Sequence, residues 1–183
     1  MADHIFSKRL EIRPFAWEDI TDEYIGWLND RDLMKHSRQR LLVHTRESCE
    51  SYLETFEYSP NFFWNVGRAR QVGTVTAYVS PVSQVANVGL MIGEPGRGYG
   101  SEAFGAVLTY LFEYRDVRKV AIGTLAANEP MVRIAARWGL RREGELREQE
   151  RVKDKWVDVY RLGILRPEWM ALEERSPITV EIR

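Results

Sequence analysis

Residues 93–100 read Gly93-Glu94-Pro95-Gly96-Arg97-Gly98-Tyr99-Gly100, with four glycines in eight positions. The stretch follows an apolar run over residues 87–92 and precedes residues 101–114, where apolar side chains recur at helical spacing. Glycines let backbone amides approach a ligand closely, and the first turn of a helix offers unpaired N–H groups with a partial positive charge. The stretch therefore predicts a strand-to-helix turn that binds a pyrophosphate, with Arg97 as a charged donor.

The spacing argues against two common nucleotide-binding motifs. A P-loop would carry Lys followed by Ser or Thr at the start of the helix, and that pair is absent here. A dinucleotide-binding fold would show Gly-x-Gly-x-x-Gly, whereas Gly96, Gly98 and Gly100 alternate with other residues. From this motif alone, an ordinary glycine-rich loop without a ligand stays open as the alternative.

Strand and helix patterns are mixed along the rest of the chain. The strand over 87–93, the helix over 101–114 and a strand over 119–124 form a crossover unit, which predicts a parallel strand pair. Residues 142–152 and 156–165 read as two strands joined by a polar turn, followed by a short helix after Pro167 and a loose tail. The remaining expected elements are strands over 10–15, 62–66 and 72–79, and helices that start at a cap on Asp19, at Thr45 and near Met131.

Composition restricts the class of protein. At 183 residues we expect one α+β domain over residues 1–183. Lys plus Arg number 26 against 27 for Asp plus Glu, a balance that argues against nucleic-acid or membrane-surface partners. Cys49 is the only cysteine, which excludes an intrachain disulfide and favours a reducing compartment. Every apolar run is far shorter than the roughly 20 residues that span a bilayer, so we expect a soluble protein, which with the reducing compartment implies the cytoplasm.

Two ordered motifs resemble the GNAT superfamily of N-acetyltransferases. Residues 96–103, Gly-Arg-Gly-Tyr-Gly-Ser-Glu-Ala, are similar to its acyl-CoA-binding signature, Arg/Gln-x-x-Gly-x-Gly/Ala. Residues 128–131 and 137–140 are similar to the family's Asn-x-x-Ser…Glu-Lys-Leu-Gly-Phe segment. Residues 144–147, together with residues 160–162, Tyr-Arg-Leu, resemble the Rim-type, ribosomal-protein-acetylating branch. The resemblance covers nearly the whole chain. It implies the GNAT fold, a mostly antiparallel mixed sheet with a central, splayed parallel strand pair flanked by helices.

The resemblance also implies a co-substrate and a reaction. Acetyl-CoA would lie between the splayed strands, its pantetheine arm pairing with backbone groups like an added strand. A neutral amine would then attack the thioester directly, without a metal. Asn128 would contact pantetheine, although a role as the cap of the next helix is equally physical. The implied acetyl-CoA-binding residues are Leu90, Met91, Ile92, Arg97, Gly98, Tyr99, Gly100, Ser101 and Asn128.

Three residues depart from the family pattern. Pro95 stands where Arg or Gln is usual and has no N–H to offer a phosphate. Ala135 occupies the place of a tyrosine that protonates the leaving thiolate in many relatives, and Asn87 that of a glutamate base. An amide cannot accept a proton at neutral pH, so the sequence assigns no catalytic residue. The titratable candidates for a base are Glu11, Glu102, His36 and His44.

The acceptor amine stays open. Residues 87–93 resemble the strand of nucleotide-sugar amine acetyltransferases, which implies an amino sugar nucleotide, and the Rim-type resemblance implies a protein N-terminus. Arg38 and Arg40, between the first two expected helices, could recruit an anionic acceptor. Because the usual glutamate and tyrosine are missing, a catalytically silent CoA-binding module is the alternative function. The charged hairpin over 145–156 could pair across subunits, which makes a homodimer a candidate assembly.

Overall fold

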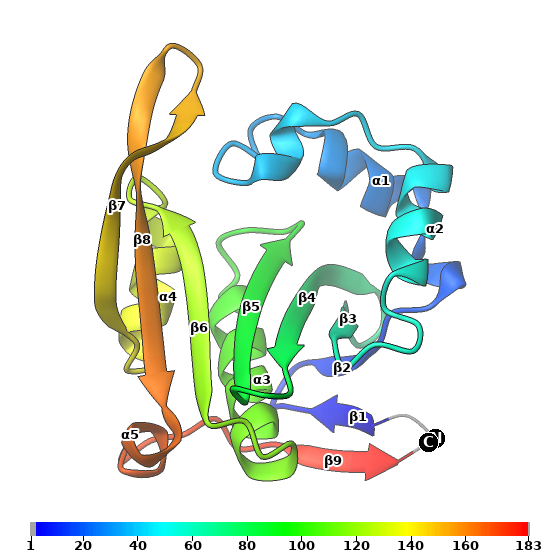
Figure 1. Ribbon diagram of the computed structural model, residues 1–183. Coiled ribbons are helices and arrows are strands. Elements are labelled where there is room, and N and C mark those ends of the chain that lie inside the picture. Colours follow the sequence, from blue (N-terminus) through cyan, green and yellow to red (C-terminus); the bar gives the residue numbers. More distant parts are fainter. Residues whose placement is uncertain (1–2, 183) are drawn as a thin grey trace.

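The computed structural model describes residues 3–182, which form one nine-stranded sheet and the helices around it (Figure 1). The strands are β1 (Asp3–Phe6), β2 (Glu11–Pro14), β3 (Phe62–Gly67), β4 (Gln71–Ser80), β5 (Val85–Ile92), β6 (Lys119–Leu125), β7 (Arg141–Val152), β8 (Lys155–Leu165) and β9 (Thr179–Ile182). The helices are η1 (Trp17–Asp19), α1 (Asp22–Asn29), η2 (Arg38–Leu41), α2 (Arg46–Glu54), α3 (Tyr99–Tyr114), α4 (Glu129–Arg137) and α5 (Arg166–Met170).

The sheet runs in the order β7-β8-β6-β5-β4-β3-β2-β1-β9. The β5–β6 pair is parallel, with α3 as its crossover, and every other pair within residues 3–182 is antiparallel. This is the mixed α+β architecture with one central parallel pair that the sequence predicted. No helix in residues 3–182 is long and apolar enough to cross a membrane.

Helices cover the two faces of the sheet unequally. One face, which we call the back face, carries α3, α4 and α5, and α3 is buried along almost its whole length. The other, the front face, carries α1 and α2 over β3 and β4, with a smaller cluster around Phe15, Tyr24 and Phe63. Side chains alternate between the faces along each strand, so Val88 and Ile122 point back whereas Met91 points forward. The front face over β5, β6 and β8 is left without a covering helix (Figure 1).

Most expected elements agree with the structure, two expectations were wrong and one strand was missed. β1 was not expected, and residues 179–182 form β9 rather than a loose tail, because β9 pairs with β1 along its whole length. Asp19 does not cap a helix: Thr21 caps α1, its hydroxyl accepting from the N–H of Tyr24. Asp19 is instead buried and held by the Arg13 guanidinium, Nη2 to Oδ1 at 2.6 Å.

Candidate functional site: a gap between two parallel strands

The parallel strands β5 and β6 stay paired over only three rungs. The last pair is Asn87 with Ala121, and beyond it the two strands diverge (Figure 1). On its other edge β5 continues to pair with β4 as far as Ile92 opposite Gly73. Residues 88–92 of β5 therefore present one edge of backbone N–H and C=O groups toward the gap, which we call the notch.

Three of the predicted binding residues lie in this part of β5. Leu90 packs against the back-face core and Met91 packs into the front cluster, so their side chains are committed to packing. The backbone groups of Leu90 and Ile92 face the notch, whereas those of Met91 face β4. This arrangement suits an extended ligand that adds to the strand by main-chain hydrogen bonds.

The glycine-rich turn lies at the open end of the notch, between β5 and α3. Gly96 and Gly98 have φ values of +87° and +76°, a left-handed conformation that favours glycine. Gly98 is the N-cap of α3, and among residues 3–182 no side chain caps the first turn of that helix. The N–H groups of Tyr99, Gly100 and Ser101 are therefore available at a positive helix end.

Ser101 adds a polar atom to this turn. Its hydroxyl oxygen is shielded from solvent and has no hydrogen-bond partner among the described residues. Its carbonyl accepts from the Trp138 indole at 2.8 Å, which ties the first turn of α3 to the end of α4. A phosphate oxygen would satisfy the hydroxyl.

Arginines surround the turn, and one of them was missed from the sequence. Arg97 reaches the Glu94 carboxylate, which also binds Arg70. The missed residue is Arg9, whose Nη1 donates to the Arg97 carbonyl at 3.0 Å and whose guanidinium stacks over the Tyr99 ring. Nothing in the local pattern around residue 9 indicates this role, because the contact spans nearly half the chain.

Glu102 holds Arg9 in place rather than acting as a base. Its carboxylate accepts from the Arg9 backbone at 2.7 Å, from Arg9 Nε at 2.6 Å and from the Ser7 hydroxyl at 2.8 Å. Desolvation opposes ionisation, but these hydrogen bonds outweigh it and lower the pKa of Glu102 below its ordinary value. A carboxylate stabilised in this way is a weak proton acceptor.

Two of the other three candidate bases have structural partners, and the third has a lowered pKa. Glu11 contacts His4 at 2.7 Å on β2 and β1, away from the notch. His44 Nε2 lies 3.2 Å from the Gln39 carbonyl, within the segment that joins α1 to α2. Desolvation lowers the pKa of His36, and the nearby cations Lys35 and Arg40 lower it further.

Asn128 and Ala135 both have structural roles. The Asn128 side chain caps α4, accepting from the Met131 N–H at 3.4 Å, and donates to the Thr124 hydroxyl at 3.0 Å. Its backbone carbonyl is engaged by Val132 of α4. Ala135 is fully buried in the back-face core, where a tyrosine would not fit without moving its neighbours.

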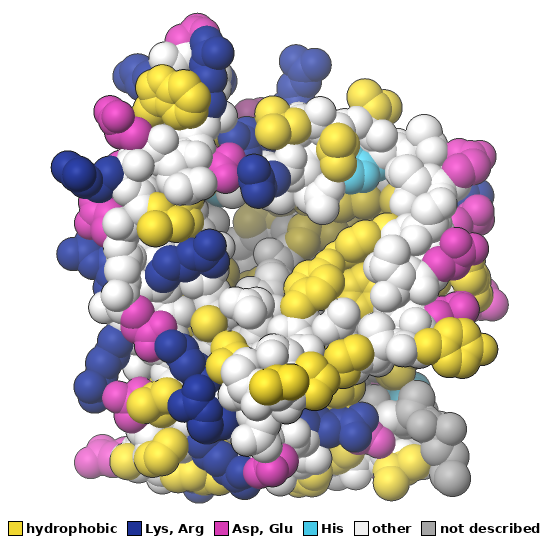
Figure 2. All heavy atoms as spheres, viewed as in Figure 1, with side chains coloured by type: hydrophobic (Ala, Val, Ile, Leu, Met, Phe, Trp, Pro, Cys, Tyr) yellow, Lys and Arg dark blue, Asp and Glu magenta, His cyan; other side chains and the backbone are white. Residues whose placement is uncertain are grey.

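Residues without large side chains form the front-face floor beside the notch. Asn87 of β5, Ala121 of β6 and Gly163 of β8 are paired side by side, and all three face the front. Two residues further along their strands, Gly89 of β5 and Gly123 of β6 also face the front. These positions leave the sheet surface low. Figure 2 shows the molecule hollowed there, between the β7–β8 hairpin and the segment that carries α1 and α2.

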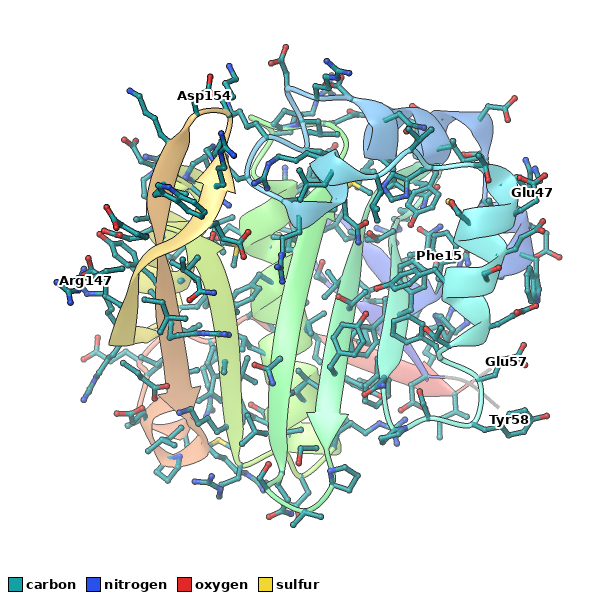
Figure 3. All side chains as sticks on the ribbon, turned by 45° about the horizontal axis from the view of Figure 1, so that its top comes forward. Phe15, Glu47, Glu57, Tyr58, Arg147 and Asp154 are labelled. Atoms are coloured by element: carbon teal, nitrogen blue, oxygen red, sulfur yellow. The ribbon has the colours of Figure 1, made fainter. Side chains whose placement is uncertain are left out.

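Aromatic side chains form the opposite wall of this hollow. Tyr52 on α2 and Tyr78 on β4 share a hydrogen bond of 2.6 Å between their hydroxyl groups, and burial raises the pKa of Tyr52. Trp27 of α1 packs flat on Gly93, where a β-carbon would lie 2.1 Å from its ring. In Figure 3, Phe15 points into the cluster between α2 and the sheet, and Glu47 points away from the sheet into solvent.

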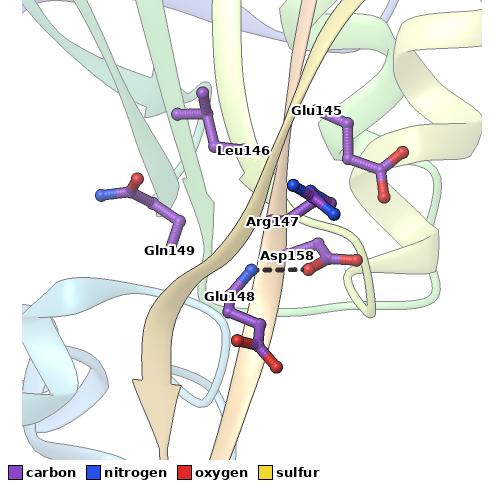
Figure 4. Close-up of a pocket in the computed structure, with 6 residues that line it drawn as sticks. All are labelled: Glu145, Leu146, Arg147, Glu148, Gln149 and Asp158. Atoms are coloured by element: carbon purple, nitrogen blue, oxygen red, sulfur yellow. Dashed lines mark hydrogen bonds between the residues drawn. The ribbon is translucent and has the colours of Figure 1, made fainter.

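Two contacts join the β7–β8 hairpin to the segment around η2. Arg38 Nε lies 3.2 Å from Glu150, and Arg40 Nη2 donates to the Arg151 carbonyl at 2.9 Å. The hairpin also carries an open pocket where β7 leaves register with β8, and there the Glu148 N–H donates to Asp158 (Figure 4). The residues that line this pocket are Glu145, Leu146, Arg147, Glu148, Gln149 and Asp158.

The known proteins that this chain resembles are acetyltransferases. Residues 9–141 match the family described as the acetyltransferase (GNAT) domain. An uncharacterized N-acetyltransferase of Bacillus subtilis, YnaD, is 26% identical over 173 residues, covering 91% of this chain and 99% of YnaD.

Solved structures share the fold. The structure of a GNAT-family acetyltransferase from Bacillus anthracis is 26% identical with a TM-score of 0.77, covering 90% of this chain and 99% of that one. Spermidine N-acetyltransferase from Vibrio cholerae, solved in complex with CoA and spermine, is 19% identical with a TM-score of 0.79, covering 88% and 98% of the two chains. At that identity the second likeness concerns the fold alone.

Proposed function

We propose, from the premise that the chain belongs to the GNAT acetyltransferase family, that it transfers the acetyl group of acetyl-CoA to a primary amine. One observation supports the donor most: a free strand edge over residues 88–92 leads directly to the uncapped N-terminus of α3. The first feature suits the pantetheine arm, and the second suits the pyrophosphate. The proposed donor-binding residues are those that the sequence predicted, Leu90, Met91, Ile92, Arg97, Gly98, Tyr99, Gly100, Ser101 and Asn128.

Within this site we assign most of the binding to backbone groups. The N–H groups of Tyr99, Gly100 and Ser101 and the Ser101 hydroxyl face the phosphates, with Arg97 and Arg9 as flanking cations. Because Pro95 offers no N–H, Arg9 is the natural replacement for the missing donor. The Asn128 side chain uses one N–H for Thr124 and one oxygen lone pair for the Met131 N–H, so its second N–H and second lone pair remain for the proposed contact with pantetheine.

The proposed reaction forms a C–N bond, breaks the C–S bond of the thioester and releases one proton from the amine. An amine with a pKa of about 10.4 is mostly protonated at neutral pH, whereas the neutral form is the nucleophile. The front-face hollow must therefore either select the neutral amine or remove water from the charged one so that it loses its proton. A backbone N–H near Met91 is the proposed donor to the thioester oxygen as negative charge develops there. With Asn87 and Ala135 in the family's catalytic places, water is the proposed proton carrier.

The finer expectations from the sequence belong to the same proposal. The acceptor candidates are an amino sugar nucleotide and a protein N-terminus. We propose one domain over residues 1–183 that acts in the cytoplasm, without a metal, a nucleic-acid partner or a membrane partner. A homodimer stays a candidate assembly, with the charged β7–β8 hairpin as its pairing element.

The test is thiol release from acetyl-CoA, followed with a thiol reagent, while the protein is offered amino sugars, polyamines, amino acids and short peptides. Calorimetry with acetyl-CoA runs in parallel. Amine-dependent release supports the enzyme and identifies its acceptor class. Binding without release from any amine would favour the silent CoA-binding module, for which the replacement of the glutamate and tyrosine by Asn87 and Ala135 is the specific observation. Failure to bind acetyl-CoA would contradict the proposal.

A further inference from the structure

Arg161 of β8 lies beside the notch on the front face. It pairs across the strands with Gly123 of β6, and a β-carbon on Gly123 would lie 3.0 Å from Arg161 Nη1. Gly123 belongs to the diverging part of β6, two residues beyond the last β5–β6 pair. The guanidinium therefore covers the β6 side of the notch at the level where Gly89 forms the β5 side.

The Arg161 guanidinium has no partner within residues 3–182. No hydrogen bond or ion pair joins it to another described residue, and it is exposed to solvent. Glu143 of the neighbouring strand β7 packs over Gly163 on the front face, and Lys119 Nζ already binds its carboxylate at 2.6 Å. The Glu143 carboxylate is already neutralised by Lys119, so the N–H donors of the exposed Arg161 guanidinium are free to bind a ligand.

The rest of the hollow adds positive rather than negative charge. Arg38 is paired with Glu150, whereas Arg40 binds only backbone carbonyls and keeps an uncompensated charge. Between residues 30 and 40 this segment carries four cations, Arg31, Lys35, Arg38 and Arg40, against two anions, Asp30 and Asp32, and the facing wall carries the neutral hydroxyls of Tyr52 and Tyr78. Figure 3 shows Glu47 and Glu57 on the outer side, directed away from the notch. Such a hollow disfavours a polycation and favours an oxyanion.

We propose that Arg161 is a specificity-determining residue that binds the anionic group, a carboxylate or a phosphate, of the amine acceptor. A guanidinium binds either oxyanion through two parallel N–H donors, and its position beside the notch holds the amine end near the thioester. The inference rests on the proposed function and narrows it. It argues against polycationic acceptors such as spermidine, which carry several positive charges and no anionic group.

The experiment uses acceptor pairs that differ in the anion, glucosamine 6-phosphate with glucosamine and leucine with leucinamide, with spermidine as the polycation. Rates are compared at equal concentrations of the neutral amine, because an amide lowers the pKa of the neighbouring α-amine. For the wild type we expect kcat/KM to be about 10- to 100-fold higher for one anionic member than for its neutral partner, the range expected for a charged hydrogen bond. Whether the phosphate or the carboxylate pair shows the preference identifies the anion.

Three variants locate the preference. Arg161→Gln should remove the preference through the acceptor KM, while kcat/KM for the neutral partner and the KM for acetyl-CoA stay within about twofold. Arg161→Lys should keep part of it, because an ammonium supplies the charge without the paired donors. Arg118→Gln, an exposed arginine at the closed end of the β5–β6 pair, is the matched control and should change nothing.

A binding measurement keeps this test separate from catalysis. Calorimetry of the CoA-loaded protein with glucosamine 6-phosphate and with leucine should show anion-dependent binding that Arg161→Gln abolishes. If no amine releases thiol but this binding is present, the proposed reaction fails and the anion site stands. The inference is overturned if spermidine is the best acceptor, if Arg161→Gln weakens both members of a pair equally, or if neither anionic amine binds or reacts better than its neutral partner.

Discussion

The two faces of the sheet are built in opposite ways. The back face is filled by large side chains from α3 and its neighbours, among them Phe104, Leu108 and Phe112, all fully buried. The front face beside the notch is formed by positions that lack large side chains, such as Gly89 and Gly123. Large buried side chains on the back face therefore supply most of the stability, whereas small residues on the front face leave the notch accessible.

The largest expected effect is on the back face. Leu108→Ala removes a fully buried side chain from α3 and should lower the free energy of unfolding by roughly 2–5 kcal/mol. Urea denaturation measures it. The same substitution at the exposed Leu42 is the control and should stay within about 0.5 kcal/mol. Equal losses at both positions would mean that the back face is not the main source of stability.

The next effect tests a glycine that serves packing. A β-carbon at Gly105 would lie 2.3 Å from the Trp138 ring, so Gly105→Ala must displace that indole and strain α3 by roughly 1–3 kcal/mol. Because the Trp138 indole donates to the Ser101 carbonyl, acetyl-CoA binding should weaken as well. Thermal unfolding and calorimetry measure the two effects. An unchanged melting temperature would contradict the packing.

A smaller effect is expected at the turn between the faces. Gly98→Ala places a side chain at a φ of +76°, which costs about 1–2 kcal/mol, and it should weaken acetyl-CoA binding by distorting the start of α3. Gly26→Ala is the matched control, since a β-carbon in α1 meets no atom within 4 Å and alanine favours a helix. Gly26→Ala should be neutral or stabilising, and equal destabilisation of both proteins would argue against the conformational explanation.

The smallest effect on stability is expected on the front face. Gly123→Ala brings a β-carbon to 3.0 Å from the Arg161 guanidinium, the far end of a flexible side chain, so unfolding should change by less than about 1 kcal/mol. The acceptor KM should rise, because the displaced guanidinium no longer covers the side of the notch. Steady-state kinetics beside urea denaturation measure both. A loss of stability comparable to that of Gly105→Ala would remove the distinction between the faces.

Local patterns predicted the elements, and long-range contacts explain what they missed. The β3–β4 hairpin, α3 and the β7–β8 hairpin each have a period and a turn within a few residues, so the sequence shows them directly. β1 and β9 are four residues each and pair with each other from opposite ends of the chain, which no local period records.

The candidate site divides in the same way. The glycines and Arg97 follow one another along the chain and were visible as a motif. Arg9 and Arg161 reach the notch only because strands from distant parts of the sequence lie beside it. A side chain placed by strand register rather than by sequence neighbours leaves no signature in one sequence.

The diverging strands can be reached from two sides, and this has a kinetic consequence for the proposed reaction. The uncapped end of α3 lies at one side of the notch and the hollow with Arg161 at the other. Two reactants that approach from separate sides do not share an entrance, so both can be bound at once and neither product must leave first. Double-reciprocal plots should therefore give intersecting lines, the pattern of a ternary complex, with no acetylated form of the protein along the way.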